Sequence, residues 1–247
     1  MKKLITLLSL AILPVLLKAQ PITYVEAPLY DNSTTTGRGP NGTSAHSYMR
    51  ACALVLQSEL TNIASGTNIT SFGFTLNSGT ASTPCPGTFS LYLQNTTDVT
   101  YLKGTTFSAC LTGMTMVYAS AMTIPASATT TSVTITLSSA FLYTGGGLYV
   151  AYDWFSTGPF DATAAVYRAN SLGLNPGCAT AASNVSAPAT LGTTAFRPCF
   201  LWGIANTFTN EAGSKIWGVA TDSTGKVYVT TGYNDLQSTG NGYISTI

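Results

Sequence analysis

Hydrophobic and polar residues alternate with a period of two in four separate segments of this chain. The segments are 70–76, 88–93, 132–137 and 148–152. A period of two places the apolar side chains on one face of a β-strand and the intervening Thr and Ser on the other. The alternation predicts that one core is shared by Phe72, Phe74, Phe89, Leu91, Val133, Ile135, Leu148 and Val150.

Weaker patterns predict further strands around these four. The additional segments are 22–27, 49–56, 114–118, 164–168 and 196–204. Pro198 favours a strand edge or start, because proline cannot donate to a ladder. No stretch after the N-terminal region keeps a helical period. Many short strands separated by long Gly-, Asn- and Pro-containing loops predict an all-β fold, an antiparallel jelly-roll-like β-sandwich over residues 20–206.

The composition changes after Asn206. Residues 207–214 carry no strand signal and are predicted to be a linker. Two alternating segments then flank Asp222–Gly225, which is typical of a β-hairpin, and a further strand is expected over 242–247. This short β-meander, 215–247, resembles one blade repeat of a β-propeller. A blade has four strands, so we expect this chain to be the N-terminal part of a longer protein.

The chain begins with the features of a secretory signal peptide. Lys2 and Lys3 precede a short apolar run, and a small residue, Ala19, comes before Gln20. This order predicts cleavage after Ala19, with residues 1–19 as the signal. No later apolar segment is long enough to span a bilayer. We therefore expect a mature chain without a transmembrane span that is secreted, extracellular or displayed at the cell surface.

The chain has few charged side chains, which bears on the classes of molecule that it could bind. Only 8% of the residues are charged, and the 9 acidic residues outnumber the basic ones once the lysines of the signal are removed. A nucleic-acid-binding protein needs a basic patch, so we expect no nucleic-acid partner. Thr, Ser and Asn supply the polarity instead, alongside 13 Tyr and 10 Phe. A glycan or cell-surface polymer is the partner class that remains.

The chain has 5 Cys, which are candidates for disulfides in an exported protein. Cys85 and Cys178 lie in Pro- and Gly-containing segments that are typical of loops. The predicted bridges are Cys178–Cys199 and Cys85–Cys110. Cys52 sits in an apolar run and is expected to be a buried free thiol. With 1 His and no C-x-x-C motif, no zinc site is predicted.

Three ordered stretches carry a resemblance to a known family. They are Gly66–Phe74 (GTNITSFGF), Leu91–Thr97 (LYLQNTT) and residues 134–151, with 114–118 fitting between the last two. Together they resemble the N-terminal jelly-roll-like β-sandwich domain of exported bacterial proteins, which are often type IX secretion substrates. The resemblance covers about half of the chain, roughly residues 45–170. It implies a sandwich at the cell surface and transfers no catalytic residue.

Candidate catalytic groups are few. His46 is the only histidine and lies beside a loop, without a G-x-S-x-G motif anywhere in the chain. Glu26, Glu59, Asp153 and Asp161 are the carboxylates best suited to acid–base chemistry. Glycoside hydrolysis needs two of them within about 5–10 Å of each other, which a sequence does not reveal. We therefore expect no enzymatic activity, with a secreted hydrolase as the exception to test.

One segment is a candidate ligand site. Asp153 follows a strand and lies among Tyr152, Trp154 and Phe155. Under one interpretation Asp153 is a strand-end carboxylate with aromatic rings packed beneath it. Under the other, the rings form a platform that stacks on a sugar. The leading function is a non-catalytic secreted or cell-surface adhesion module, and the alternative is a carbohydrate-binding accessory domain of a larger hydrolase.

Calcium is the only cofactor with a candidate site, and we expect none to be required. Calcium takes oxygen ligands, and Asp31, Asn32 and Asp161 lie in segments that are typical of loops. Their spacing is not that of a known calcium loop.

Overall fold

The structure is a computed structural model of the 247-residue chain. Backbone contacts divide the chain into two compact units, Met1–Ala205 and Asn206–Ile247. In the first unit the structure describes residues 22–42, 46–77, 83–126, 129–160 and 165–205. In the second it describes the backbone of residues 214–221, 227–233 and 243–246.

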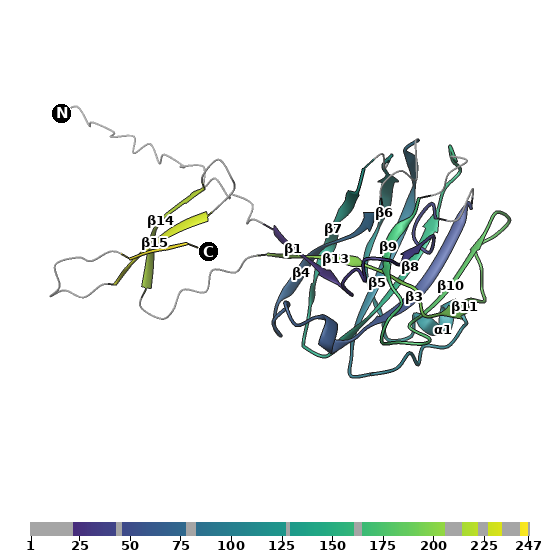
Figure 1. Cartoon of the computed structure of the whole chain (residues 1–247), viewed down its shortest axis with the longest axis horizontal. Coiled ribbons are helices and arrows are strands. Elements are labelled where there is room, and N and C mark those ends of the chain that lie inside the picture. Colours follow the sequence, from purple (N-terminus) through teal and green to yellow (C-terminus); the bar gives the residue numbers. More distant parts are fainter. Residues whose placement is uncertain are drawn as a thin grey trace, which may run out of the picture. The chain divides into compact units, whose positions relative to one another are not determined.

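The first unit contains a seven-stranded antiparallel sheet (Figure 1). Its main path runs through β1 (Ile22–Ala27), β13 (Phe200–Ala205), β4 (Asn68–Leu76), β9 (Tyr167–Asn170) and β12 (Arg197–Pro198). Two further strands pair with β4 and β9 respectively: β7 (Thr131–Leu142) and β2 (Thr35–Thr36). β1 thus pairs with a strand almost 180 residues later in the chain.

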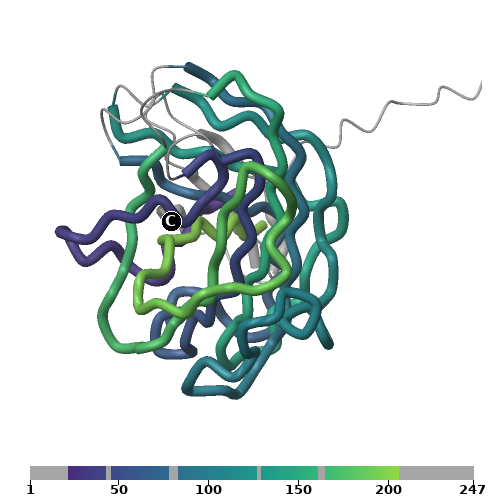
Figure 2. The backbone as a smooth tube through the Cα atoms, turned by 90° about the vertical axis from the view of Figure 1, so that its right-hand side faces the viewer, coloured from purple at the N-terminus to yellow at the C-terminus, as the bar shows by residue number. Residues whose placement is uncertain are grey.

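A six-stranded antiparallel sheet forms the second layer. Its order is β11 (Gly192–Thr194), β10 (Cys178–Ser183), β3 (Tyr48–Val55), β8 (Gly147–Phe155), β5 (Cys85–Thr96) and β6 (Thr115–Ile124). In Figure 2 dark-blue early segments lie among green late ones, as the pairing of β3 with β8 and β10 requires. The two sheets form a sandwich, so the prediction of an all-β antiparallel sandwich is confirmed.

Alternating side chains of the two sheets meet in one core. All eight residues that the alternation assigns to a shared core belong to it, and that prediction is confirmed. Phe74 lies among five other aromatic rings, with centroids 5.2–6.0 Å away: Phe72, Phe89, Tyr152, Tyr167 and Phe200. Most of these contacts are edge-on, which is the arrangement that aromatic quadrupoles favour.

The elements missing from the sequence prediction are short or poor in apolar residues. β10 has the sequence CATAAS and β11 has only 3 residues. A four-residue helix, α1 (Phe107–Cys110), was also missed. A single 3-10 turn, η1 (Gln57–Glu59), follows β3. The predicted strand over 196–204 is divided at Cys199 into β12 and β13.

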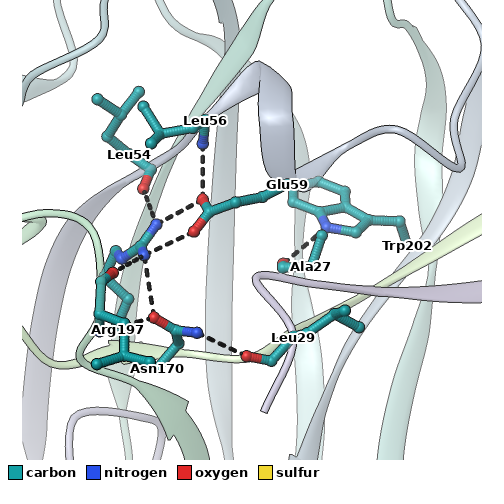
Figure 3. A network of polar contacts seen from close by, with 9 residues as sticks. Ala27, Leu29, Leu54, Leu56, Glu59, Asn170, Arg197 and Trp202 are labelled. Atoms are coloured by element: carbon teal, nitrogen blue, oxygen red, sulfur yellow. Dashed lines mark hydrogen bonds and ion pairs between the residues drawn. The ribbon is translucent and has the colours of Figure 1, made fainter. Parts of the chain in front are cut away.

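An ion pair around the fully buried Arg197 ties the two sheets together (Figure 3). Arg197 of β12 has no exposed surface and donates from both terminal nitrogens to the two oxygens of Glu59, at 2.6 and 2.7 Å. It also donates to the carbonyls of Leu54, in β3 of the other sheet, and Leu172, both at 3.0 Å. Such bidentate pairs hold both partners in a fixed orientation, so Arg197 fixes η1 and β3 against the first sheet.

The second unit is an antiparallel meander of β14 (Ser214–Thr221), β15 (Val227–Tyr233) and β16 (Tyr243–Thr246). The predicted strands of this region are confirmed, whereas its turn at 222–225 and most of the predicted linker lie outside the described residues. In the part of the chain that the structure describes, no helix has the length and hydrophobicity needed to cross a membrane.

Candidate functional site

The four residues of the predicted ligand site alternate between the two faces of β8. Tyr152 and Trp154 face the core between the sheets and have no exposed surface. Asp153 and Phe155 face outward. β8 runs to Phe155, so Asp153 lies within the strand rather than at its end. The prediction that Tyr152 or Trp154 forms a sugar platform is wrong, because they continue the core-facing parity of Leu148 and Val150.

Tyr152 has a structural role in the core. Its ring packs edge-on against Phe74, at 5.6 Å between centroids. Its hydroxyl donates a hydrogen bond to the carbonyl of Arg38, which satisfies the polar end of a buried ring. Desolvation by burial raises the pKa of Tyr152 well above its ordinary value, so the hydroxyl stays protonated and keeps donating.

Asp153 forms an ion pair with Arg50 on the outer face of the second sheet. The two residues are direct partners in the register of β3 and β8. Arg50 donates from Nε (3.0 Å) and from Nη2 (2.7 Å), and both bonds end on Oδ2 of Asp153. The side chains are 22% and 27% exposed. Both charges therefore remain within reach of a ligand, and Oδ1 is an acceptor that Arg50 does not use.

The guanidinium of Arg50 is held in place from two further directions. Its carbon lies 4.5 Å from the centroid of the Phe107 ring, in a cation–π contact. Its Nη1 donates to the carbonyl of Pro188 at 3.2 Å. The charged group is thus oriented before any ligand arrives, which lowers the entropy that binding has to overcome.

A shallow depression of about 270 Å³ surrounds this pair. Arg50 and Asp153 supply its charged part, and the rest of the lining is formed by Tyr92, Phe107, Ser108, Leu111 and Ala189. Tyr92 is half-buried and comes from β5, the strand beside β8. The depression thus offers one ion pair, the hydroxyls of Tyr92 and Ser108, and two aromatic side chains, Tyr92 and Phe107.

A second hydrophobic cluster lies on the outer face of the second sheet and includes Phe107, which lines the depression. Outward residues of β3 and β8, such as Leu54 and Tyr149, pack there against Phe107 and Cys110 of α1 and against Tyr101. The hydroxyl of Tyr149 donates to Oδ2 of Asp98 at 2.8 Å, and this bond ties the loop between β5 and α1 to the sheet. The signal for α1 is the spacing of Phe107, Cys110 and Leu111, which share one helical face.

All five cysteines are buried free thiols in the structure, so neither predicted disulfide is formed. Cys85 begins β5 and faces the inter-sheet core, whereas Cys110 lies in the cluster on the opposite face of the sheet. Cys178 begins β10 in the second sheet, whereas Cys199 lies between two strands of the first. The proline and glycine beside Cys85 and Cys178 predict loops, whereas each cysteine is the buried first residue of a strand.

The candidate calcium ligands bind other groups or lie outside the described residues. Oδ1 of Asp31 accepts from the backbone nitrogens of Ser33 and Thr34, and Oδ2 accepts from that of Ser171. Desolvation raises the pKa of Asp31, but these hydrogen bonds outweigh it and hold the pKa well below its ordinary value. Asp31 thus stabilises a turn, and Asn32 is its exposed neighbour. Asp161 is outside the described residues.

The other candidate catalytic residues lie apart from the depression. Glu26 of β1 accepts from the Tyr30 nitrogen and from the Thr75 hydroxyl, and Glu59 belongs to the Arg197 pair. His46 is a half-buried residue just before β3. Among the described residues, no three His, Cys, Asp or Glu side chains come together as a metal site would require.

Comparison with known proteins gives no relative of this chain. No family model matches it. No curated protein and no solved structure matches it either.

Proposed function

We propose that this chain is a non-catalytic binding module of a secreted or cell-surface protein, and that it takes its ligand in the depression over Arg50 and Asp153. The single observation that carries the proposal is the partly exposed ion pair, oriented by Phe107 and Pro188 beside the half-buried ring of Tyr92. Polar groups fixed in this way beside an aromatic surface are typical of a recognition site.

The position of the depression on the sheet favours binding. Arg50, Asp153 and Tyr92 belong to three adjacent strands, β3, β8 and β5. Side chains on strands are held more rigidly than side chains on loops. The hollow is shallow and lies on an open sheet face, which suits one part of a long polymer better than a whole small molecule.

The carboxylates favour a non-catalytic role. Glu26, Glu59 and Asp153 each bind a different partner, and they lie on β1, on η1 and on the outer face of β8. A glycosidase holds two carboxyl groups about 5–10 Å apart across one bond of its substrate. The three residues lie on different elements, so neither Glu26 nor Glu59 supplies a second carboxylate beside Asp153.

A carbohydrate-binding accessory domain is the second candidate, and Tyr92 favours it. A tyrosine ring presents an apolar face to a pyranose and a hydroxyl at its edge. Asp153 Oδ1 and the guanidinium of Arg50 would accept from and donate to sugar hydroxyls. In this version Tyr92 takes the place that the sequence suggested for Tyr152 and Trp154.

A glycan array probed with the purified chain tests these candidates. Binding of a saccharide that Arg50→Ala and Tyr92→Ala reduce at least tenfold supports the carbohydrate-binding domain. Arg168→Ala is the matched control, because Arg168 stacks on Tyr30 at 4.9 Å and belongs to the other sheet. Binding that Arg168→Ala weakens as much as Arg50→Ala does would place the ligand elsewhere.

Immobilised surface polymers of bacterial and host cells, offered in parallel, test the adhesion module. Retention on such a polymer without a hit on the array favours adhesion. A broad panel of hydrolase substrates tests the absence of catalysis. Turnover that Asp153→Asn abolishes would contradict the non-catalytic proposal.

A further inference from the structure

Two cysteines meet beneath α1, on the outer face of the second sheet. Cys52 points outward from β3, and Cys110 is the last residue of α1. Both have no exposed surface and belong to the same hydrophobic cluster. Each of the two thiols has the largest effect on the pKa of the other, so the two side chains are neighbours within this cluster. The structure therefore brings together two thiols that are 58 positions apart in the sequence.

The surroundings of Cys110 favour its thiolate form. The neighbouring thiol of Cys52 is the largest influence, and it lowers the pKa of Cys110 against the opposing effect of burial. The hydroxyl of Tyr101 lies 3.4 Å from the same sulfur, and the positive charge of Lys103 acts in the same direction. Together they bring the pKa of Cys110 to about 6 and raise that of Cys52.

The other three cysteines lie away from Cys52 and Cys110. Cys178 is paired with Ala53 in the sheet register and so faces the inter-sheet core, on the opposite side from Cys52. Cys85 faces the same core, where its sulfur lies 3.3 Å from the hydroxyl of Ser156. Cys199 lies between β12 and β13 of the first sheet, and its backbone nitrogen donates to the carbonyl of Arg168.

We propose that Cys52 and Cys110 are joined by a disulfide in the exported protein, and that this bond fastens α1 to β3. Disulfides persist in the oxidising compartments outside the cytoplasm, which is where the predicted signal sends the chain. The proposal depends on the position of the two sulfurs and holds whatever the ligand of the depression is.

The oxidant is a small-molecule disulfide such as oxidised glutathione. The Cys110 thiolate attacks one glutathione sulfur, forms a mixed disulfide and releases one glutathione thiolate, which takes up a proton. Cys52 then loses its proton and attacks the Cys110 sulfur, which releases the second glutathione. Two electrons pass from the protein thiols to the oxidant, and two glutathione thiols are produced. Both sulfurs are buried, so exchange occurs before α1 docks or while it is open.

The bond would also stabilise one wall of the proposed binding site. Phe107 and Ser108 line the depression and precede Cys110 by one helical turn or less. A four-residue helix has little stability of its own, so its position depends on what fastens it. A covalent link from its last residue to β3 would hold Phe107 beneath the guanidinium of Arg50.

Peptide mapping of the full chain tests the proposal. The protein is purified under reducing conditions, oxidised with a mixture of reduced and oxidised glutathione, and treated with N-ethylmaleimide in denaturant. Digestion without reductant should yield one cross-linked peptide pair that joins Cys52 and Cys110, with the other three cysteines alkylated. Alkylation of all five cysteines, or a bridge from Cys52 or Cys110 to another partner, would overturn it.

A matched variant keeps the test informative if single substitutions at the pair unfold the chain. Cys85→Ala, Cys178→Ala and Cys199→Ala combined should leave the Cys52–Cys110 bridge intact. Oxidised wild type should melt roughly 10 °C above the reduced form, because the bond restricts the unfolded chain. Cys110→Ala should show no such difference. A bridged wild type that melts no higher than the reduced protein would contradict the fastening of α1.

Discussion

The two arginine–carboxylate pairs of the sandwich have the same chemistry in opposite environments. The guanidinium of Arg197 is wholly buried and uses both oxygens of Glu59 as well as carbonyls from each side. The side chain of Arg50 is 22% exposed, and its guanidinium uses a single oxygen of Asp153. The first pair has little capacity left for another partner, whereas the second is oriented, charged and open to solvent. Burial therefore separates the pair that stabilises the fold from the pair that is available to a ligand.

Removing the buried arginine should cause the largest change. Arg197→Met removes the fully buried partner of Glu59 together with its bonds to the Leu54 and Leu172 carbonyls, and we expect a loss of about 3–5 kcal/mol in the free energy of unfolding. Urea denaturation measures it. Arg197→Met combined with Glu59→Leu should lose much less than the single variant. A loss below about 1 kcal/mol for the single variant would mean that Arg197 does not fix η1 and β3 against the first sheet.

A smaller loss should follow from Tyr152→Phe. The substitution removes the hydroxyl that donates to the Arg38 carbonyl and leaves that acceptor unsatisfied, at a cost of about 1–2 kcal/mol. Urea denaturation gives the size of the loss. Binding of any ligand found for the depression should be unchanged, because the ring lies on the opposite face of β8. Weakened binding without a loss of stability would put Tyr152 at the surface.

The exposed pair should show the reverse behaviour. Arg50→Ala should cost about 1 kcal/mol or less of stability, because solvent screens a partly exposed ion pair. The same substitution should weaken ligand binding at least tenfold. Denaturation and binding measured on one preparation separate the two effects. A stability loss as large as that of Arg197→Met would show that the two pairs do not differ in the way their burial suggests.

The smallest effect concerns pH. The pKa of Asp31 is depressed in the folded chain, so its carboxylate stabilises the fold above its ordinary pKa of about 4. This stabilisation is lost as the pH falls through that value toward the folded pKa. The thermal midpoint should therefore fall less between pH 6 and pH 3 in Asp31→Asn than in wild type. If the thermal midpoints of the two proteins fall in parallel with pH, the charge of Asp31 does not stabilise its turn.

The sequence predicted the sandwich because its longer strands alternate regularly, as 132–137 and 148–152 do. It missed β10, where CATAAS has small side chains in place of an apolar face. It also misplaced the site, although the parity of Tyr152 and Trp154 with Val150 pointed to the core. The Arg50–Asp153 pair depends on the register of β3 and β8, over 103 positions of sequence. A local pattern of apolar and polar residues does not predict which residues of two distant strands pair.

Hydrogen–deuterium exchange of the full chain, with and without a saccharide selected by the glycan array, tests the binding site most directly. Binding there should slow exchange in peptides that cover α1 and residues 186–191, which border the depression, and should leave the core strand β4 unchanged. Protection confined to the turn at Gln57–Ser58, or to the first sheet, would contradict the assignment of the ligand to the Arg50–Asp153 depression.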